Sequence, residues 1–271
     1  MKILEAVGVS KTYRRGGFFS RSESVQVLRG VELSVSQGEC VGVVGRSGSG
    51  KSTLGRLLLG LEAPSAGEVR ILGETTTDGR GKLRLTPEQR QAAQVVFQDA
   101  VGSVNPRLTA GTILSEPLRN LDRLRGAALS ERVVELLEQV GLNKDDAAKH
   151  PGHFSGGQLQ RLSIARALAA RPRCIILDEA VSSLDMLMQA RILDLLDVLR
   201  RERGVAYLFV THDLRLVRRF CDRAVAMENG RLEPFDLTGD AVHKMSDSLR
   251  ELAEAILPSC PGGGFLPTSQ D

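Results

Sequence analysis

Short apolar runs alternate along the chain with longer segments in which apolar residues recur every three or four positions. The strand-like runs cover residues 40–44, 94–97, 173–177 and 206–210. Helical periodicity is found at residues 51–61, 130–140, 157–170, 187–201 and 213–220. Apolar strands buried on both faces and alternating with helices are typical of a mostly parallel sheet covered by helices. The pattern therefore predicts an α/β fold.

The first 35 residues have a different pattern. Apolar and polar positions alternate at residues 3–9 and 31–35, on either side of a segment rich in arginine and glycine at 14–21. Period-two alternation is typical of strands with one buried face. We expect an N-terminal antiparallel β layer with a surface loop at 14–21.

Strand signals are also scarce between Gln98 and about residue 165, where helices and turns dominate. This scarcity predicts a helical subdomain at 99–165, inserted in a compound domain that spans residues 1–235. From residue 236 to 271 the periodicity weakens, and the last residues contain Pro-Gly-Gly-Gly. We expect a short C-terminal extension whose tail is loosely ordered.

Composition narrows the class of protein. The 271 residues are 42% hydrophobic and 25% charged, as in ordinary globular proteins. No apolar run approaches the roughly 18–20 residues of a membrane span, and the N-terminus does not resemble a secretory signal. The net charge, 36 − 33 = +3, is too small to indicate a nucleic-acid partner. The four cysteines lack the paired spacing of a zinc site, which favours reduced packing residues: Cys40, Cys174, Cys221 and Cys260.

A glycine-rich loop after the first apolar strand carries the strongest chemical signal. The segment fits the pattern G-x-x-x-x-G-K-[ST], in which backbone N–H groups surround phosphate oxygens at a helix N-terminus. Its residues are Gly45, Arg46, Ser47, Gly48, Ser49, Gly50, Lys51 and Ser52. Lys51 is expected to reach the β- and γ-phosphates of ATP, and Ser52 to ligate Mg²⁺. We call residues 45–52 the phosphate loop.

Two carboxylates end a later apolar strand. Asp178 and Glu179 follow the run Cys-Ile-Ile-Leu. By itself this arrangement is usually structural, but together with a phosphate loop it places an acid beside bound Mg²⁺. We expect Asp178 to hold the metal and Glu179 to act as the general base that polarises the attacking water.

A third motif identifies the family. The signature segment Phe154, Ser155, Gly156, Gly157 and Gln158 resembles the LSGGQ signature of ATP-binding cassettes, with phenylalanine in place of leucine. By itself Ser155 could simply cap a helix. The resemblance implies a P-loop NTPase fold with a RecA-like parallel sheet. It also implies that two cassettes pack head to tail, so that the signature of one contacts the γ-phosphate bound to the other.

Further positions match the same family. The resemblance implies that Gln98 senses Mg²⁺ and water, that His212 contacts the γ-phosphate, and that Tyr13 stacks on adenine. A tyrosine in a β layer is also often a packing residue. Residues 182–185, ending in Asp185, match the loop that communicates between the two sites. The chain departs from the common Pro-Thr pair at Ala180 and Val181, although both carboxylates remain.

The architecture favours a transporter subunit within this family. Long heptad arms, zinc modules and a second cassette, which mark the repair and translation ATPases, are missing from the sequence. An arginine cluster could suggest nucleic acid, but on a helix it is more typical of a solvated face: Arg215, Arg218, Arg219 and Arg223.

Several segments resemble the peptide and nickel importer subfamily, and its nickel branch most closely. They are residues 14–21, 97–99, 103–107, 116–118, 178–185, 211–217, 219–221 and 255–258. The resemblance implies an ATPase that energises nickel(II) uptake, with uptake of dipeptides, oligopeptides or metallophores as the alternative. It implies a paralogous ATPase subunit, two membrane permeases and an external solute-binding protein as partners, no nucleic acid, and a peripheral position on the cytoplasmic face of the inner membrane.

Overall fold

The computed structural model of the chain describes residues 1–15, 23–182 and 184–236. The predicted C-terminal tail and most of the predicted loop at 14–21 lie outside these ranges. Arg14 and Arg15, which we expected in that loop, instead belong to strand β1 (Lys2–Arg15). They extend the pairing with strand β2 (Glu23–Ser36), where Arg14 lies opposite Ser24.

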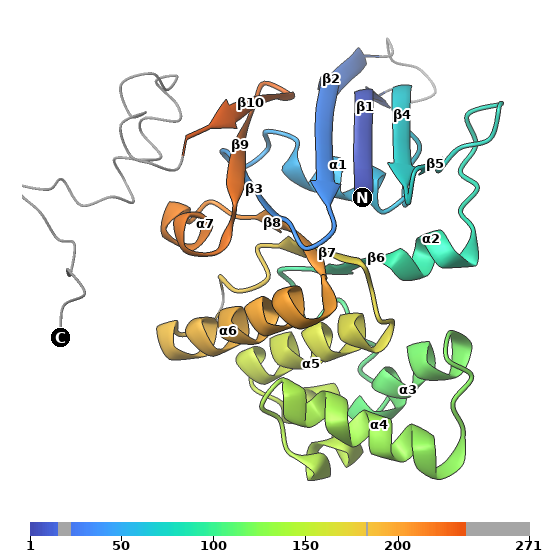
Figure 1. Ribbon diagram of the computed structural model, residues 1–271, viewed down its shortest axis with the longest axis vertical. Coiled ribbons are helices and arrows are strands. Elements are labelled where there is room, and N and C mark those ends of the chain that lie inside the picture. Colours follow the sequence, from blue (N-terminus) through green and yellow to red (C-terminus); the bar gives the residue numbers. More distant parts are fainter. Residues whose placement is uncertain (16–22, 183, 237–271) are drawn as a thin grey trace, which may run out of the picture.

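A six-stranded sheet forms the centre of the molecule (Figure 1). Its order is β10 (Arg231–Phe235), β9 (Arg223–Glu228), β3 (Cys40–Val44), β8 (Ala206–Val210), β7 (Cys174–Asp178) and β6 (Ala93–Val96). Neighbouring strands are parallel except β10, which pairs antiparallel with β9. The four predicted strands thus lie side by side, and β3 and β8 are buried throughout.

A second, antiparallel sheet packs over helix α1 (Lys51–Leu58). Its order is β2, β1, β4 (Ala66–Ile71) and β5 (Glu74–Thr75), which confirms the predicted N-terminal antiparallel layer. One apolar cluster joins this sheet to α1 and to one face of the central sheet. Helix α1 ends before the predicted residue 61, and Gly60 just beyond it takes a left-handed conformation (φ 63°).

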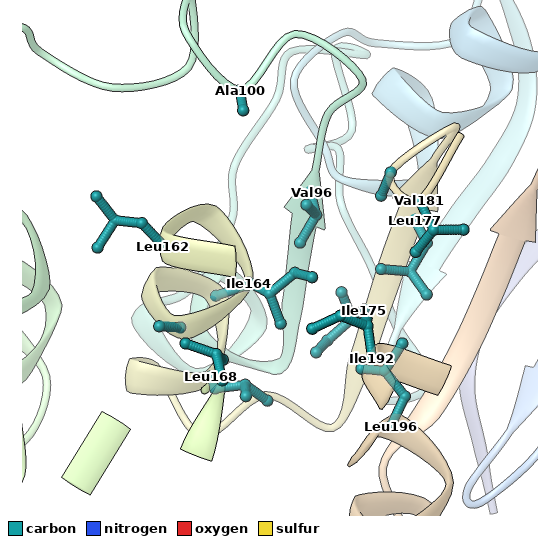
Figure 2. Packing of buried hydrophobic residues seen from close by; sticks show 14 of the residues in the cluster. Val96, Ala100, Leu162, Ile164, Leu168, Ile175, Leu177, Val181, Ile192 and Leu196 are labelled. Carbon is teal, nitrogen blue, oxygen red and sulfur yellow. The ribbon is translucent and has the colours of Figure 1, made fainter. Parts of the chain in front are cut away.

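The other face of the central sheet is covered by helices. Helices α5 (Gly156–Ala169), α6 (Met186–Arg203) and α7 (Leu214–Phe220) share one apolar cluster with it. Figure 2 shows Ile164 of α5 beside Val96 of β6, and Ile192 of α6 near Ile175 of β7. This packing holds the start of α5, where the signature segment lies, at a defined position relative to the sheet.

The region at 99–165 is helical, as its sequence pattern predicts. It contains α3 (Ala110–Asn120), α4 (Gly126–Gln139), the 3₁₀ turns η1 (Lys144–Ala148) and η2 (Pro151–His153), and most of α5, and no strand forms between 99 and 165, all of which the structure describes. These helices gather at one end of the molecule (Figure 1). Whether they form a separate subdomain stays a prediction.

Several elements were not foreseen: α2 (Pro87–Ala92), α3, β4, β5, β9 and β10. The start of α2 could have been found, because Thr86 and Gln89 form a capping box and Pro87 between them is the first residue of the helix. Among the residues that the structure describes, no helix has both the length and the apolar character that a membrane span requires.

Candidate functional site

Strand register brings the predicted motifs to one edge of the central sheet. Val43 at the end of β3 lies opposite Val210 of β8, and Val210 lies opposite Asp178 of β7. Backbone hydrogen bonds continue the pairing past the strand ends, since the Glu179 N–H donates to the Val210 carbonyl at 2.9 Å. The loops that follow these three parallel strands therefore converge at their carboxyl ends, where open α/β sheets bind ligands.

A cavity of about 280 Å³ lies at this edge. Its walls combine residues 47, 48 and 50–52 of the phosphate loop with Gln98 and the Asp178–Glu179 pair, whereas Arg46 and Ser49 line a second, larger cavity. Val27, Thr53 and Arg56, which the sequence did not single out, complete the walls of the first cavity. The larger cavity, of about 430 Å³, lies on the other side of the loop, against β2 and the turn between β9 and β10. The smaller cavity is the candidate site because only it contains the carboxylates.

The backbone of the phosphate loop requires glycine. Gly45 has φ 153°, and a Cβ there would lie 2.5 Å from the Met227 carbonyl oxygen; Gly50 has φ 115°. Lys51 is only 7% exposed, and its ammonium donates to the carbonyls of Gly45 at 2.7 Å and Arg46 at 2.8 Å. Within the described residues, the buried Ser49 hydroxyl has no hydrogen-bond partner. A curled loop with a buried cation and a spare hydroxyl fits a phosphate chain.

Burial shifts the pKa values of two charged groups in the cavity wall, Lys51 and Asp178. Desolvation lowers the pKa of Lys51, and the nearby carboxylates of Glu179 and Asp178 oppose this shift. Desolvation raises the pKa of Asp178, while a hydrogen bond from the Ser52 hydroxyl opposes that shift. A half-buried carboxylate that lies beside a hydroxyl is a donor set that suits Mg²⁺.

Glu179 and His212 meet at the mouth of the site. The Nδ1 atom of His212 lies 3.4 Å from Oε1 of Glu179, and the histidine side chain is 54% exposed. Glu179 has φ 51°, a left-handed conformation that is uncommon outside glycine. Asp178 and Glu179 are both half-buried and both line the cavity, but of the two only Glu179 also contacts the exposed histidine.

Tyr13 belongs to a polar network that the sequence did not predict. Its hydroxyl donates to Oε2 of Glu62 at 2.6 Å, and the Lys11 ammonium lies 5.1 Å from its ring centroid. Arg56 and Lys11 also pair with Glu62, at 2.7 and 3.1 Å. The hydrogen bond from Tyr13, followed by those from the two cations, lowers the pKa of Glu62 to about 2. Glu62 therefore fixes the tyrosine ring beside Arg56, a residue of the cavity wall.

The signature segment caps helix α5. The Ser155 hydroxyl accepts from the Gln158 N–H at 3.3 Å, and the Gln158 side chain accepts from the Ser155 N–H at 2.9 Å. The reading of Ser155 as a helix cap is confirmed. Phe154 is buried in the apolar cluster with α5, which gives a packing role to the residue that replaces leucine. Among the described residues that line the candidate cavity, none comes from this segment.

The loop after the carboxylates is both packed and capped. Ala180 and Val181 are buried in the apolar cluster, so the departure from Pro-Thr adds apolar contacts there. The Asp185 carboxylate caps α6 by accepting from the Met188 N–H at 2.9 Å. Ser183, in the middle of the predicted communication loop, lies outside the described residues.

Side chains of α5 hold the loop that carries Gln98. The buried Gln160 amide donates to the Phe97 carbonyl at 3.1 Å, and Arg166 donates to the Ser103 carbonyl. Sequence reasoning missed both residues. They are six positions apart on the helix, which is not the spacing of a single face, so their spacing gave no signal and the sequence did not indicate what they contact.

The arginine cluster is largely neutralised at the surface. Ion pairs connect Arg215 to Asp213, Arg219 to Asp194 and Arg223 to Glu39. These pairs agree with the interpretation of the cluster as a solvated face.

Comparison with known proteins agrees with this geometry. The sequence profile of the ABC transporter family matches residues 28–182. The chain is 48% identical to the nickel import ATP-binding protein NikE of Rhodospirillum rubrum over 266 residues, which cover 97% of this chain and 95% of that protein. It is 44% identical to NikE of Escherichia coli over 265 residues, which cover 96% and 97%.

A solved structure has the same fold. The ATP-binding cassette MJ0796, determined as a dimer in a post-hydrolysis state with ADP and Pi, superimposes with a TM-score of 0.75 at 33% identity and covers 88% of this chain and 100% of that chain. The predicted α/β P-loop fold and the resemblance to nickel import ATPases are thus both confirmed. The chain belongs to the ABC transporter family, as one of its ATP-binding subunits.

Proposed function

We propose that this chain is the ATP-hydrolysing subunit of an importer for nickel(II) ions. ATP hydrolysis is supported by one observation: residues of the phosphate loop, Gln98, Asp178 and Glu179 line the same cavity. The proposal of nickel as cargo rests on the identity with nickel import proteins along nearly the whole chain. Nickel itself would contact the membrane subunits and not this chain.

The residues of the cavity divide the work of phosphoryl transfer. Lys51 and the loop N–H groups bind the phosphate chain of ATP, and Ser52, Asp178 and Gln98 are the donors that would hold Mg²⁺. When bound, Mg²⁺ neutralises the charge that develops on the phosphate oxygens. Tyr13, held by Glu62, supplies a rigid face on which adenine can stack.

Glu179 is placed to accept the proton of the attacking water. Its side chain is 22% exposed, and its contact with His212 limits the directions in which its carboxylate can point. His212 itself is exposed enough to reach a γ-phosphate oxygen above the cavity. Preorganised positions of this kind lower the barrier to phosphoryl transfer mainly through orientation and electrostatics.

Activity is proposed to need a second cassette. Ser155 and Gly156 are exposed at the start of α5, and at the start of α6 Met186 and Leu187 are 82% and 64% exposed. Exposed apolar side chains next to Asp185 fit a protein partner better than water. The partner we propose is a paralogous ATPase subunit, whose phosphate loop meets this signature and whose signature meets this phosphate loop.

The remaining partners couple hydrolysis to transport. We propose that the helices at 99–165 form a subdomain that docks on two permease subunits and moves with the nucleotide state, and that a solute-binding protein delivers the cargo. The contacts of Gln160 and Arg166 support this coupling, because they link the loop of Gln98 to the signature helix. The complex would place this chain peripherally at the inner membrane.

Nickel uptake in a deletion strain tests the cargo. The strain should accumulate radioactive nickel only at background level, and the parental gene should restore uptake. The matched variant Glu179→Gln, which keeps the shape of the side chain but not the base, should fail to restore it. Normal nickel uptake together with defective dipeptide or metallophore uptake would refute the nickel assignment and favour the peptide-type alternative.

Paired mutations test the arrangement of the two cassettes. Lys51→Met in this chain combined with a signature mutation in the paralogue disables one composite site and leaves the other intact. Lys51→Met combined with Ser155→Arg in this same chain disables both. Reconstituted transporter should retain activity only in the first case, and equal activity in the two cases would contradict the composite-site arrangement.

A further inference from the structure

Two cysteines from distant parts of the chain meet behind the nucleotide site. The sulfur atoms of Cys40 and Cys221 lie 3.5 Å apart, although the residues are separated by 181 positions. Cys40 begins β3, and Cys221 follows the last residue of α7. The nucleotide chemistry uses neither thiol.

The backbone around the two thiols is held by hydrogen bonds on both sides. The Asp222 N–H donates to the Cys40 carbonyl at 2.9 Å, and the Cys40 N–H donates to Oδ2 of Asp222 at 2.8 Å. Arg200 in turn pairs with the Asp222 carboxylate at 3.1 Å. This clamp fixes the segment that carries Cys221 against the first residue of β3.

Gly42 of β3 has no side chain, and this allows helix α7 to pack close to the strand. A Cβ on Gly42 would lie 2.6 Å from Cγ1 of Val217 and 3.3 Å from the sulfur of Cys221. Cys40 and Gly42 are two residues apart on one strand and so face the same side of the sheet. The Cys221 sulfur therefore lies over the surface of β3 that also carries Cys40.

The two thiols differ in access to solvent. Cys40 is fully buried and donates its hydrogen to the sulfur of Cys221, which is half-buried. Burial, followed by the contact with Cys221, raises the pKa of the Cys40 thiol. We therefore expect a small oxidant to react first with Cys221. The S–H group of the buried Cys40 already contacts the Cys221 sulfur.

We propose that Cys40 and Cys221 are a modification site at which a hydroperoxide forms an intramolecular disulfide. The Cys221 thiolate attacks the outer peroxide oxygen, the O–O bond breaks, and the alcohol or water leaves, so that Cys221 becomes a sulfenic acid. The Cys40 sulfur then attacks the Cys221 sulfur, the S–O bond breaks, and the hydroxide leaves as water with the Cys40 proton. In total two thiols lose two electrons and two protons, and the peroxide is reduced to alcohol and water.

The geometry needs only a small movement for the second step. The two sulfurs must close from 3.5 Å to the roughly 2.05 Å of a disulfide, which a change in the Cys side-chain torsions can supply. A bond that closes so long a loop restricts the unfolded chain strongly. Oxidation should therefore raise the midpoint of thermal unfolding, by about 5–15 °C.

The test uses the full-length chain with Cys260→Ser, so that the tail thiol cannot take part and three cysteines remain. After treatment with hydrogen peroxide and denaturation, free thiols should fall from three to one. Non-reducing peptide mapping should identify one linked pair of peptides, which contain Cys40 and Cys221 and lack two hydrogens. The unfolding midpoint should rise, and a reductant should reverse the rise.

Two further variants separate this site from general oxidation. Cys174→Ser, which removes another buried thiol, should still form the disulfide. Cys40→Ser should leave Cys221 as a sulfenic acid that dimedone labels, and Cys40→Ala serves if the serine variant unfolds. Cys221 oxidised to sulfinic acid while Cys40 stays free, or a link through Cys174, would overturn the proposal.

Discussion

The buried ammonium of Lys51 can be removed with little change in shape by Lys51→Met. The variant keeps the apolar stem and loses the charge together with the donors to the Gly45 and Arg46 carbonyls. If the cavity binds ATP as proposed, it also loses a cation that contacts the phosphate chain. Stability and affinity then respond differently, and their magnitudes can be compared.

Two opposing effects limit the change in stability that Lys51→Met causes. Hydrogen bonds to a charged group contribute about 1.5–3 kcal/mol each, so their loss destabilises the fold. However, desolvation lowers the pKa of Lys51, which means that burial already penalises the charged form that methionine removes. We expect a net loss of at most about 2 kcal/mol, which lowers the unfolding midpoint by no more than about 4–8 °C.

For the affinity for ATP, we expect no comparable gain to offset the lost contact. Loss of one charge-assisted contact to ATP costs about 1.5–3 kcal/mol, which raises the Kd roughly 10- to 150-fold. Titration of the variant with a fluorescent ATP analogue measures the Kd, and thermal unfolding measures the stability. Lys2→Met is the matched control, because the Lys2 side chain is 57% exposed and its ion pair with Glu5 lies away from the candidate cavity. A Kd within twofold of the parent in a folded Lys51→Met protein would refute the phosphate-loop assignment.

Other substitutions test separate parts of the site and core. Glu179→Gln should retain ATP binding and lose about 10²- to 10⁴-fold in hydrolysis rate, and hydrolysis at the parental rate would exclude Glu179 as the base. Glu62 has a folded pKa of about 2 against an ordinary 4.5, so its stabilising contribution is present above pH 4.5 and lost as the pH falls toward 2. Denaturant titrations across that range should show a shallower acid loss of stability for Glu62→Gln, and an unchanged slope would count against the network. Gly42→Ala should destabilise by about 1–3 kcal/mol in urea unfolding because its Cβ would meet Val217 at 2.6 Å, whereas Gly79→Ala, in open space, should be neutral.

Much of the candidate site could be predicted because its parts are local. The phosphate loop needs glycines at fixed offsets between a strand and a helix, and the run that ends in Asp178 and Glu179 needs only a buried strand followed by acids. Parallel strands present their carboxyl ends at one edge, so strand order alone brings these loops together. The capping of α5 by Ser155 is local in the same way, since all its partners lie within three residues.

Weaker local signals explain the missed elements. Strand β10 (Arg231–Phe235) has no run of apolar residues, so pairing with β9 is what makes it a strand. Strand β9 does contain the apolar run 224–227, a local signal that could have been found. Arg14 and Arg15 were assigned to a loop because they are polar, yet strand pairing with β2 extends through them. At such positions the pairing with a neighbouring strand determines whether a residue belongs to a strand, and its intrinsic strand propensity does not.

The sequence by itself determined the fold class, the family and the positions of the catalytic motifs, because each depends on a pattern within a few consecutive residues. Only the tertiary structure decided which residues support them. Glu62 holds Tyr13 across 49 positions, and Gln160 holds the Phe97 carbonyl across 63. Cys40 and Cys221 meet across 181. Such contacts are set by how helices and strands pack, since side chains far apart in sequence leave no shared local pattern, and the folded chain alone places their atoms within bonding distance.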